Sequence, residues 1–556
     1  MSTLSSLAGV LALSFVIQTP RETADVLLVG PILTLDANRP RASALAIRGG
    51  RILAVGERSS LEPYVGPGTE TIELPGIAVP GLADAHAHAS GLGEQLATLD
   101  LRGLRKPEIL ARVLEVAARV PEGEWILGGG WDEGHFRPAE FPTAADLDTV
   151  TTRHPVVLDR IDGHSIWVNS RALAAASVSR ATEDPQGGKL LRDSAGEPTG
   201  ILVDHATAFV RRIVPEPSPA EAERRLRAAL QEYARLGLTS VHDAGSDRET
   251  LLLYKKLLAE DSLPVRVYAM ANGRGDLVGE ILARGPEIAL GEGRLTVRGF
   301  KVVLDGALGS RGAQLFEPYA DAPSERGLET MGDEEFRDLI QRAAAKDFQV
   351  NAHAIGDRAV RRALDAFEAA GEEARRLRFR IEHASVIDPA DRPRFAKLGV
   401  IASIQPMFAG EYARWSEDRV GPSRASSVLA TRSLLDAGAR LAFGTDYPAS
   451  DSGDPLLNFY CAVTRRAADG TPREGFLPEE RVSAETALRL LTEGPAFASF
   501  QEQDLGALTP GRYADLTVFS GDPLTTPPDE LRELEVRMTI VGGRVVYTAG
   551  KALPAR

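Results

Sequence analysis

The stretch Ile77-Ala78-Val79-Pro80-Gly81-Leu82-Ala83-Asp84-Ala85-His86-Ala87-His88 is an apolar run that ends in two histidines. After it, compact apolar runs alternate with amphipathic segments rich in Ala, Arg and Glu, such as Ala220 to Leu236. This alternation is typical of βα units around a parallel sheet. The pattern predicts an α/β fold, a TIM-like (β/α)₈ barrel, with strands at Ile77–His86, Thr239–Gly245, Val265–Ala271, Gly299–Gly306, Phe348–Ala354, Phe379–Ala384, Gly399–Gln405 and Arg440–Thr445.

The gap between the first two predicted strands is too long for a single connecting helix. We therefore expect residues from about 95 to 215 to form an inserted subdomain, within a catalytic barrel that spans residues 77–495. This stretch is rich in Gly, Pro and polar turn residues. Because active sites of such barrels lie at the carboxyl ends of the strands, an insertion after the first strand is expected to cover the mouth of the site.

Both ends of the chain have the pattern of short strands broken by turns. The pairs Gly49-Gly50 and Gly542-Gly543 each separate two apolar runs, which is a hairpin signal. We expect residues 24–76 and 496–556 to meet in one composite β-sandwich domain. The alternative is that the two ends form separate edge strands with no shared domain.

The first residues are ambiguous. Leu4 to Ile17 is apolar enough for a signal peptide and too short for a membrane span, so residues 1–23 are a candidate leader and no integral membrane segment is expected. No Lys or Arg precedes this run, and a buried strand or helix is the alternative. The protein would be exported (periplasmic or secreted) with a leader and cytoplasmic without one.

Composition limits the chemistry. The formal net charge of −14 argues against a nucleic-acid partner, because phosphate binding needs clustered Lys and Arg. Cys461 is the only cysteine, so an intrachain disulfide and a cysteine-cluster metal site are both excluded. Any metal must be held by His, carboxylate or modified Lys.

His86 and His88 are the first candidate metal ligands. On an extended strand, residues i and i+2 project to the same face, so both imidazoles can reach one ion. A neutral imidazole nitrogen is a good ligand for Zn²⁺. Asp84 lies on the same face and is expected to orient a ligand. The competing interpretation is a pair of solvent-facing loop histidines.

Three further residues stand at the ends of predicted strands. His353 and His383 each close an apolar run, and Asp446 closes the last one. A carboxylate at that position can bind metal and also transfer a proton. The alternatives are core histidines bonded to backbone carbonyls and a helix N-cap at Asp446.

Lys301 lies near the start of the strongly apolar run Phe300 to Gly306. A buried lysine is costly unless it is paired or modified. One solution is a salt bridge with Asp305. The other is carbamylation by CO₂, which turns the amine into a carboxylate able to bridge two cations.

Taken together, these residues resemble the amidohydrolase superfamily and, more narrowly, the amidohydrolase-3 family, which includes N-substituted formamide deformylases. The resemblance covers nearly all of the chain after residue 24 and is carried by the stretches Gly130-Trp131-Asp132, Gly163 to Leu173, Asp305 to Gly312, His353 to Ala359 and Thr539 to Gly543. It implies one or two divalent metal ions, zinc foremost, with a carbamylated Lys301 in the binuclear case. The ligands that it implies are His86, His88, Lys301, His353, His383 and Asp446.

The expected reaction is hydrolysis of an amide or related C–N bond, such as that of an N-substituted formamide, by a metal-activated hydroxide. Asp446 would transfer the proton, and His164 is a candidate donor to the substrate or oxyanion unless it is a structural loop histidine. Trp131, His242 and Arg311 are candidate substrate-binding residues. A structural role is the alternative for His242, and pairing with Glu317 or Asp321 is the alternative for Arg311.

Two other functions remain open from the residues alone. A phosphoester- or lactone-hydrolysing enzyme on the same barrel would use the same ligands. A non-catalytic regulator derived from the hydrolase fold would be expected to lose ligands first, whereas all six candidate positions are filled here. The expected partner is a small-molecule substrate, and a homodimer is the commonest assembly for such a protein.

Overall fold

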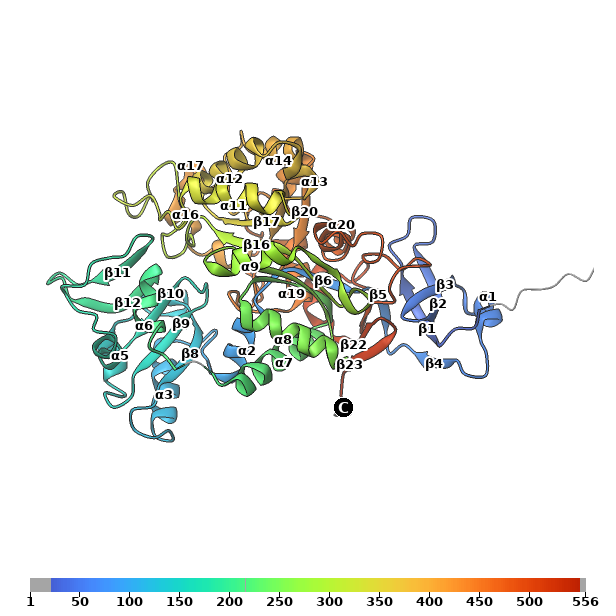
Figure 1. The fold of residues 1–556 in the computed structure, drawn as a ribbon, viewed down its shortest axis with the longest axis horizontal. Coiled ribbons are helices and arrows are strands. Elements are labelled where there is room, and N and C mark those ends of the chain that lie inside the picture. The colour runs from blue at the N-terminus through green and yellow to red at the C-terminus, as the bar shows by residue number, and fades with distance from the viewer. Residues whose placement is uncertain (1–21, 216, 551–556) are drawn as a thin grey trace, which may run out of the picture.

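The computed structural model describes residues 22–215 and 217–550. Figure 1 shows three parts arranged along the long axis: a sheet built from both ends of the chain, a central barrel, and an inserted subdomain at the opposite end. The candidate leader, residues 1–23, falls outside the described residues except for its last two. In the described part of the chain, no helix is long and apolar enough to cross a membrane.

The central sheet confirms the predicted barrel. Its eight parallel strands follow one another around the sheet in chain order, and β15 (Glu287–Ala289) adds to β16 as an antiparallel edge. The two ends of the sheet are joined by backbone hydrogen bonds from Asp446 N to His86 O (2.7 Å) and from His88 N to Tyr447 O (2.9 Å). The barrel strands are β6 (Leu82–Ala87), β13 (Leu238–Ser246), β14 (Arg266–Asn272), β16 (Leu295–Val303), β17 (Gln349–Ala354), β18 (Arg380–His383), β19 (Ile401–Ile404) and β20 (Arg440–Phe443).

The first predicted strand requires a correction. Ile77–His86 is two strands that belong to two sheets: β5 (Ile77–Pro80) pairs with β1 and β21, whereas β6 pairs with β13. The break falls at Gly81, where a Cβ would lie 2.2 Å from Oγ1 of Thr239. A proline followed by a residue without a side chain therefore lets the chain pass from the terminal sheet into the barrel.

Helices surround the barrel, and α7 (Pro219–Arg235) shows why they form. Ser218 caps its first turn by accepting a hydrogen bond from Glu221 N, and Pro219 takes the first helical position, where no N–H is needed. Leu226, Leu230 and Tyr233 follow the helical period and are buried against the barrel. The other main helices are α8 (Arg248–Ala259), α9 (Asp276–Arg284), α11 (Asp333–Ala344), α12 (Asp357–Ala369), α14 (Arg392–Leu398), α18 (Thr431–Asp436), α19 (Pro455–Thr464), α20 (Ala484–Leu490) and α21 (Glu493–Ala498).

The terminal strands form one continuous sheet, with strands from the first and the last parts of the described chain. Both predicted hairpins are present: Gly49 and Gly50 (φ +55° and +73°) join β2 to β3, and Gly542 and Gly543 (φ +58° and +74°) join β22 to β23. Positive φ at both central residues is what such tight turns require. The strands are β1 (Val26–Leu33), β2 (Arg41–Arg48), β3 (Arg51–Gly56), β4 (Glu70–Glu73), β5, β21 (Leu516–Phe519), β22 (Val536–Val541) and β23 (Arg544–Thr548).

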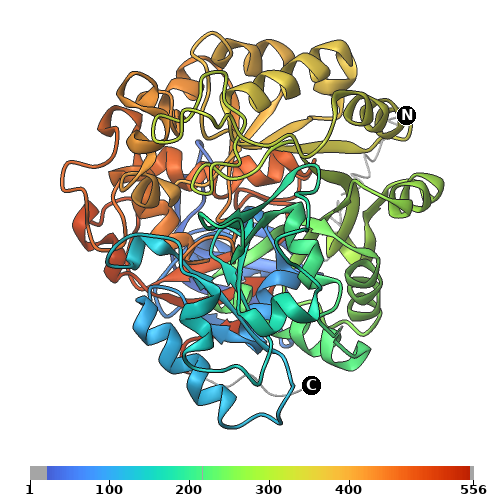
Figure 2. The same cartoon turned by 90° about the vertical axis from the view of Figure 1, so that its left-hand side faces the viewer.

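The insertion follows α2 (Ala89–Ala97) and has its own six-stranded sheet and apolar core. Seen from its own end of the molecule, it lies in front of the barrel (Figure 2). Its elements are β7 (Leu99–Asp100), α3 (Lys106–Ala117), β8 (Ile126–Trp131), α4 (Ala144–Asp148), β9 (Val156–Arg160), β10 (Ser165–Val168), α5 (Ser170–Ala175), β11 (Gly188–Arg192), β12 (Pro198–Asp204) and α6 (Ala208–Arg211).

Candidate active site

A cavity of about 510 Å³ lies between the insertion and the carboxyl ends of the barrel strands. Its size is that of a site for a small organic ligand. Five of the six predicted metal ligands line it, namely His88, Lys301, His353, His383 and Asp446. The sixth, His86, is fully buried and contacts four of these five side chains, those of His88, Lys301, His383 and Asp446.

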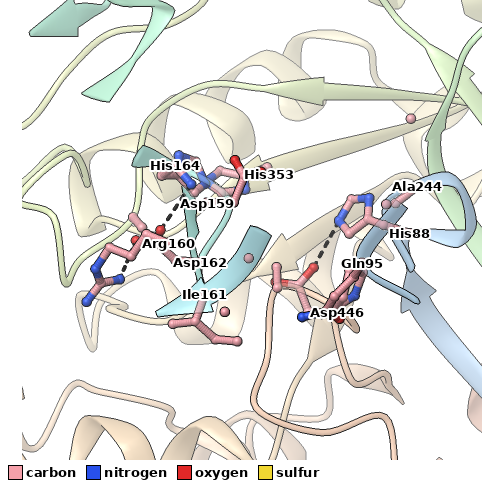
Figure 3. Close-up of a pocket in the computed structure, with 18 of the residues that line it drawn as sticks. His88, Gln95, Asp159, Arg160, Ile161, Asp162, His164, Ala244, His353 and Asp446 are labelled. Atoms are coloured by element: carbon pink, nitrogen blue, oxygen red, sulfur yellow. Dashed lines mark hydrogen bonds and ion pairs between the residues drawn. The ribbon is translucent and has the colours of Figure 1, made fainter. Parts of the chain in front are cut away.

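His86, His88 and Asp446 form the tightest cluster. Oδ1 of Asp446 lies 3.0 Å from Nε2 of His88 and 3.3 Å from Nε2 of His86, and Figure 3 shows the His88–Asp446 contact. One donor atom from each residue lies within 4.8 Å of the others. Two imidazole nitrogens and a carboxylate oxygen are a donor set that suits zinc and related divalent cations, so these residues fit a metal ion.

His353 and His383 lie beside this cluster. Their ring centroids are 4.5 Å apart, and the His383 ring lies 4.8 Å from that of His86. Nδ1 of His383 is 2.9 Å from Oε1 of Gln405. Nε2 of His353 is buried and makes no hydrogen bond within the described part of the chain. Oδ1 of Asp305 lies 3.6 Å from this nitrogen. A buried imidazole nitrogen without a hydrogen bond is costly in a core but is what a metal ligand requires.

Two of the candidate ligands have strained backbone. His383 (φ +71°) and Asp446 (φ +65°) both occupy the left-handed region, which is unfavourable for residues with a side chain. His383 is the last residue of β18, and Asp446 lies three residues after the end of β20. Such strain at the carboxyl ends of β18 and β20 is typical of functional sites in this fold.

Lys301 lies at the edge of the cluster, with Nζ 3.0 Å from Nε2 of His86. Burial lowers its pKa, although Glu382 and Asp446 act in the opposite direction. The salt bridge with Asp305 considered from the sequence is not formed. Asp305 instead accepts hydrogen bonds from three backbone amides, those of Gln314, Ile355 and Gly356.

Several buried residues hold the candidate ligands in place and were not predicted as site residues. Oε2 of Glu382 lies 2.5 Å from Nδ1 of His86, and Arg380 Nε lies 2.8 Å from the other oxygen of this carboxylate. Both charged side chains are fully buried inside the barrel. Glu382 directly precedes His383 in β18, a fully buried strand that also contains Arg380. Two opposite charges in a segment predicted to be a barrel strand are the signal that could have identified Glu382.

Asp84 has the supporting position expected from the sequence. Its Oδ1 accepts hydrogen bonds from His86 N (3.0 Å) and Thr445 N (2.9 Å), so it ties the end of β6 to the end of β20.

The pKa of Asp446 is held well below its ordinary value: burial acts to raise it, but the nearby imidazoles of His383, His88 and His86 outweigh burial. Asp446 is therefore an ionised carboxylate in the absence of added ligands.

The insertion contributes His164 to the same cavity. Its ring centroid is 5.2 Å from that of His353, and Figure 3 shows the two side chains together on the side of the cavity away from His88 and Asp446. Burial would lower the pKa of His164, but the carboxylate of Asp204, 2.6 Å from Nδ1, raises it to about 9. His164 is therefore a protonated hydrogen-bond donor at neutral pH.

The three predicted substrate-binding residues lie elsewhere. Trp131 is fully buried in the core of the insertion, where its Nε1 donates to Leu158 O. His242 is buried in the barrel below the cavity, with Nδ1 3.1 Å from Arg380 Nη1. Arg311 pairs with Asp321 at 2.8 Å, which was its alternative role. None of the three is among the residues that line the cavity in the described part of the chain.

An eight-stranded parallel barrel with imidazoles and a carboxylate gathered at its carboxyl end has the architecture of the metal-dependent hydrolases. The comparison with family models agrees: the model described as the amidohydrolase family matches residues 74–547. The chain belongs to this family.

Individual relatives support the assignment. The chain is 35% identical to the putative amidohydrolase YtcJ of Bacillus subtilis, with 93% of this chain and 98% of that protein covered. It is 29% identical to the N-substituted formamide deformylase of Arthrobacter pascens, with 93% and 97% covered. Among solved structures, an uncharacterised metal-dependent hydrolase from Pyrococcus furiosus is 31% identical with a TM-score of 0.70, over 90% of this chain and all (100%) of that one.

Proposed function

We propose that this protein hydrolyses the C–N bond of a small amide and that N-substituted formamides are among its substrates. The observation that carries the proposal is the convergence of His86, His88 and Asp446, with donor atoms within 4.8 Å of one another, at the wall of a ligand-sized cavity. The similarity to a formamide deformylase over nearly the whole chain supports the choice of bond.

The metal content belongs to the proposal as well. We propose that the cluster holds one or two divalent cations, zinc foremost, with His86, His88, His353, His383 and Asp446 as ligands. A divalent cation at such a site supplies Lewis-acid activation of water and of a carbonyl group. An ammonium group at Lys301, 3.0 Å from a ligand nitrogen, would repel a cation, whereas a carbamate there would bind it. We therefore include carbamylation of Lys301.

The protein's own groups have distinct roles in this reaction. The ionised carboxylate of Asp446 lies in the cluster and can accept the proton of the attacking water and return it to the departing amine. Protonated His164 can donate a hydrogen bond to the carbonyl oxygen as negative charge develops on it. Glu382 and Gln405 fix the ring orientations of His86 and His383, and such partners usually set ligand geometry.

The proposal is tested by substrate comparison. Protein produced in zinc-supplemented medium is assayed with an N-alkylformamide, a phosphate monoester and a γ-lactone, and formate, phosphate and ring opening are measured. We expect kcat/KM to be highest for the formamide and to fall with Asp446→Asn. Faster turnover of the phosphate ester or the lactone would contradict the choice of bond. No turnover of any of the three by metal-loaded protein would favour a non-catalytic regulator.

A further inference from the structure

One wall of the cavity is a row of three aromatic rings. Phe408 and Tyr412 are the two ends of the short helix α15 (Phe408–Tyr412), and Trp415 follows in the next turn. These positions have the spacing i, i+4 and i+7, which places side chains on the same side of a helical segment. All three line the cavity.

The row begins at the candidate metal centre. The Phe408 ring is stacked on the imidazole of His383, with centroids 6.4 Å apart and an interplanar angle of 17°. Tyr412 is stacked on Phe408 at 5.7 Å and 5°, and Trp415 contacts Tyr412 at 4.7 Å. The aromatic surface therefore runs from a candidate ligand along the cavity wall.

The rings are held as a rigid surface. Phe408 and Tyr412 are 7% and 4% exposed, and the Tyr412 hydroxyl is 3.3 Å from Oγ of Ser385. Trp415 packs against Gly309, where a Cβ would lie 3.5 Å from the indole ring. The tyrosine hydroxyl already has a partner, whereas Nε1 of Trp415 is buried and has no hydrogen-bond partner in the described part of the chain. The wall therefore offers a ligand ring edges and one indole N–H.

The rest of the cavity leaves space beside this wall. Gly128, Gly129, Gly130 and Gly245 also line it and present no side chains. A formamide group is far smaller than a cavity of about 510 Å³, a size that accommodates drug-sized ligands. Among the described residues that line the cavity, carboxylates (Glu94, Asp159, Asp162, Asp243, Asp247, Glu411 and Asp446) outnumber cationic side chains (Arg160, Arg211 and Lys301). A cationic substituent is therefore the competing class, and the first experiment includes one.

From this arrangement we infer that the aromatic wall of Phe408, Tyr412 and Trp415 is the subsite for an aryl or arylalkyl substituent of the amide. The inference rests on the proposed function and adds the substrate class to it. The amide group would lie at the candidate metal centre and the ring of the substituent would pack against the wall. Edge-to-face and offset contacts of this kind contribute beyond simple burial.

The first experiment compares three formamides whose N-substituents are 2-phenylethyl, butyl and 4-aminobutyl. The metal-loaded enzyme is expected to have a kcat/KM about tenfold or more higher for the phenylethyl compound than for the butyl compound. Equal values for these two, or a preference for the aminobutyl compound, would overturn the inference. The proposed function would still stand in either case, because formamide hydrolysis would have been observed.

Variants of the wall residues test whether a preference for the phenylethyl compound depends on the aromatic wall. Tyr412→Leu and Trp415→Leu are each expected to lower the phenylethyl-to-butyl ratio about three- to tenfold, the range of one aromatic contact. Tyr412→Phe keeps the ring and loses only the hydroxyl, so it is the matched control and should keep the wild-type ratio. An unchanged ratio in both leucine variants would place the preference elsewhere and contradict the inference.

A binding measurement separates the subsite from catalysis. Metal-free wild-type protein and the same variants are titrated with N-(2-phenylethyl)formamide and N-butylformamide by calorimetry. We expect tighter binding of the phenylethyl compound to wild type and to Tyr412→Phe, and a loss of that difference in the leucine variants. Equal affinity of both compounds for wild type would overturn the inference even if no formamide were hydrolysed.

Discussion

Nδ1 of His164 lies 2.6 Å from Oδ1 of Asp204, and both residues belong to the insertion although the His164 ring reaches a candidate metal ligand of the barrel. The barrel packs closely around this pair. A Cβ added to Gly306 would lie 2.7 Å from Oδ2 of Asp204, and one added to Gly312 would lie 3.0 Å from the same atom. The two glycines of the loop after β16 therefore allow the insertion to bring its histidine to the active site.

Replacing Asp204 should impair catalysis through His164. In Asp204→Asn the imidazole loses the carboxylate that orients it and favours its protonated form, so we expect kcat to fall about 10²-fold with little change in KM, as for loss of one oxyanion donor. Steady-state kinetics measures this. Asp148→Asn, at a half-buried aspartate of the insertion that is bonded to Ser170, is the control and should keep wild-type values. Equal kcat in both variants would show that His164 does not act on the reacting group.

Glu382 should affect metal affinity indirectly, through its contact with the candidate ligand His86. In Glu382→Gln the imidazole of His86 loses its carboxylate partner, and the loss of such a partner typically lowers metal affinity about 10- to 100-fold. Competition with a chromogenic chelator measures the change. Glu368→Gln, on the exposed side of α12, is the control. Unchanged affinity in Glu382→Gln would mean that His86 does not bind the metal through its other nitrogen.

Replacing Lys301 tests how many metal ions the site holds. If its carbamate bridges two cations, Lys301→Ala should hold about one equivalent of metal where the wild type holds two. Metal uptake by the wild type should also depend on bicarbonate, whereas uptake by the variant should not. Elemental analysis after reconstitution with and without bicarbonate distinguishes these cases. One equivalent in both proteins, independent of bicarbonate, would identify a mononuclear site with an unmodified lysine.

The barrel and the candidate metal ligands are predictable because their signals are local. An apolar run predicts a buried strand, and a histidine or aspartate at its end is placed at the carboxyl edge by the fold itself. His353 and His383 were found in this way, and both lie at the cavity. The split of the first strand at Gly81 was missed because apolar residues stand on both sides of Pro80-Gly81, and the sequence does not show that β5 and β6 pair in different sheets.

The substrate side of the cavity could not be predicted in the same way. Which residues face a cavity between two subdomains depends on how the insertion packs, and that is set by contacts distant in sequence. Trp131 and Arg311 stand in family-like motifs, but one is in a core and the other in a surface ion pair. The spacing of Phe408, Tyr412 and Trp415 was a visible helical pattern, but the sequence alone does not distinguish a cavity wall from a core.

Trp131 should therefore behave as a core residue. It packs among Phe136, Phe141 and Trp167, so Trp131→Ala is expected to cost about 3–5 kcal/mol of stability. The KM of the remaining folded enzyme should stay close to the wild-type value. Chemical denaturation and steady-state kinetics measure the two effects. A large rise in KM without loss of stability would restore the substrate-binding role.

The most direct test of the account is the metal content of purified protein. Three proteins are produced in zinc-supplemented medium: wild type, His86→Ala and the control His205→Gln. His205 is an exposed histidine of the insertion. Bound metal is measured by elemental analysis. The account predicts one to two equivalents in wild type and in the control, and a clear loss in His86→Ala with the fold retained. No metal in the wild type, or the same metal content in all three proteins, would contradict a metal centre at this cluster.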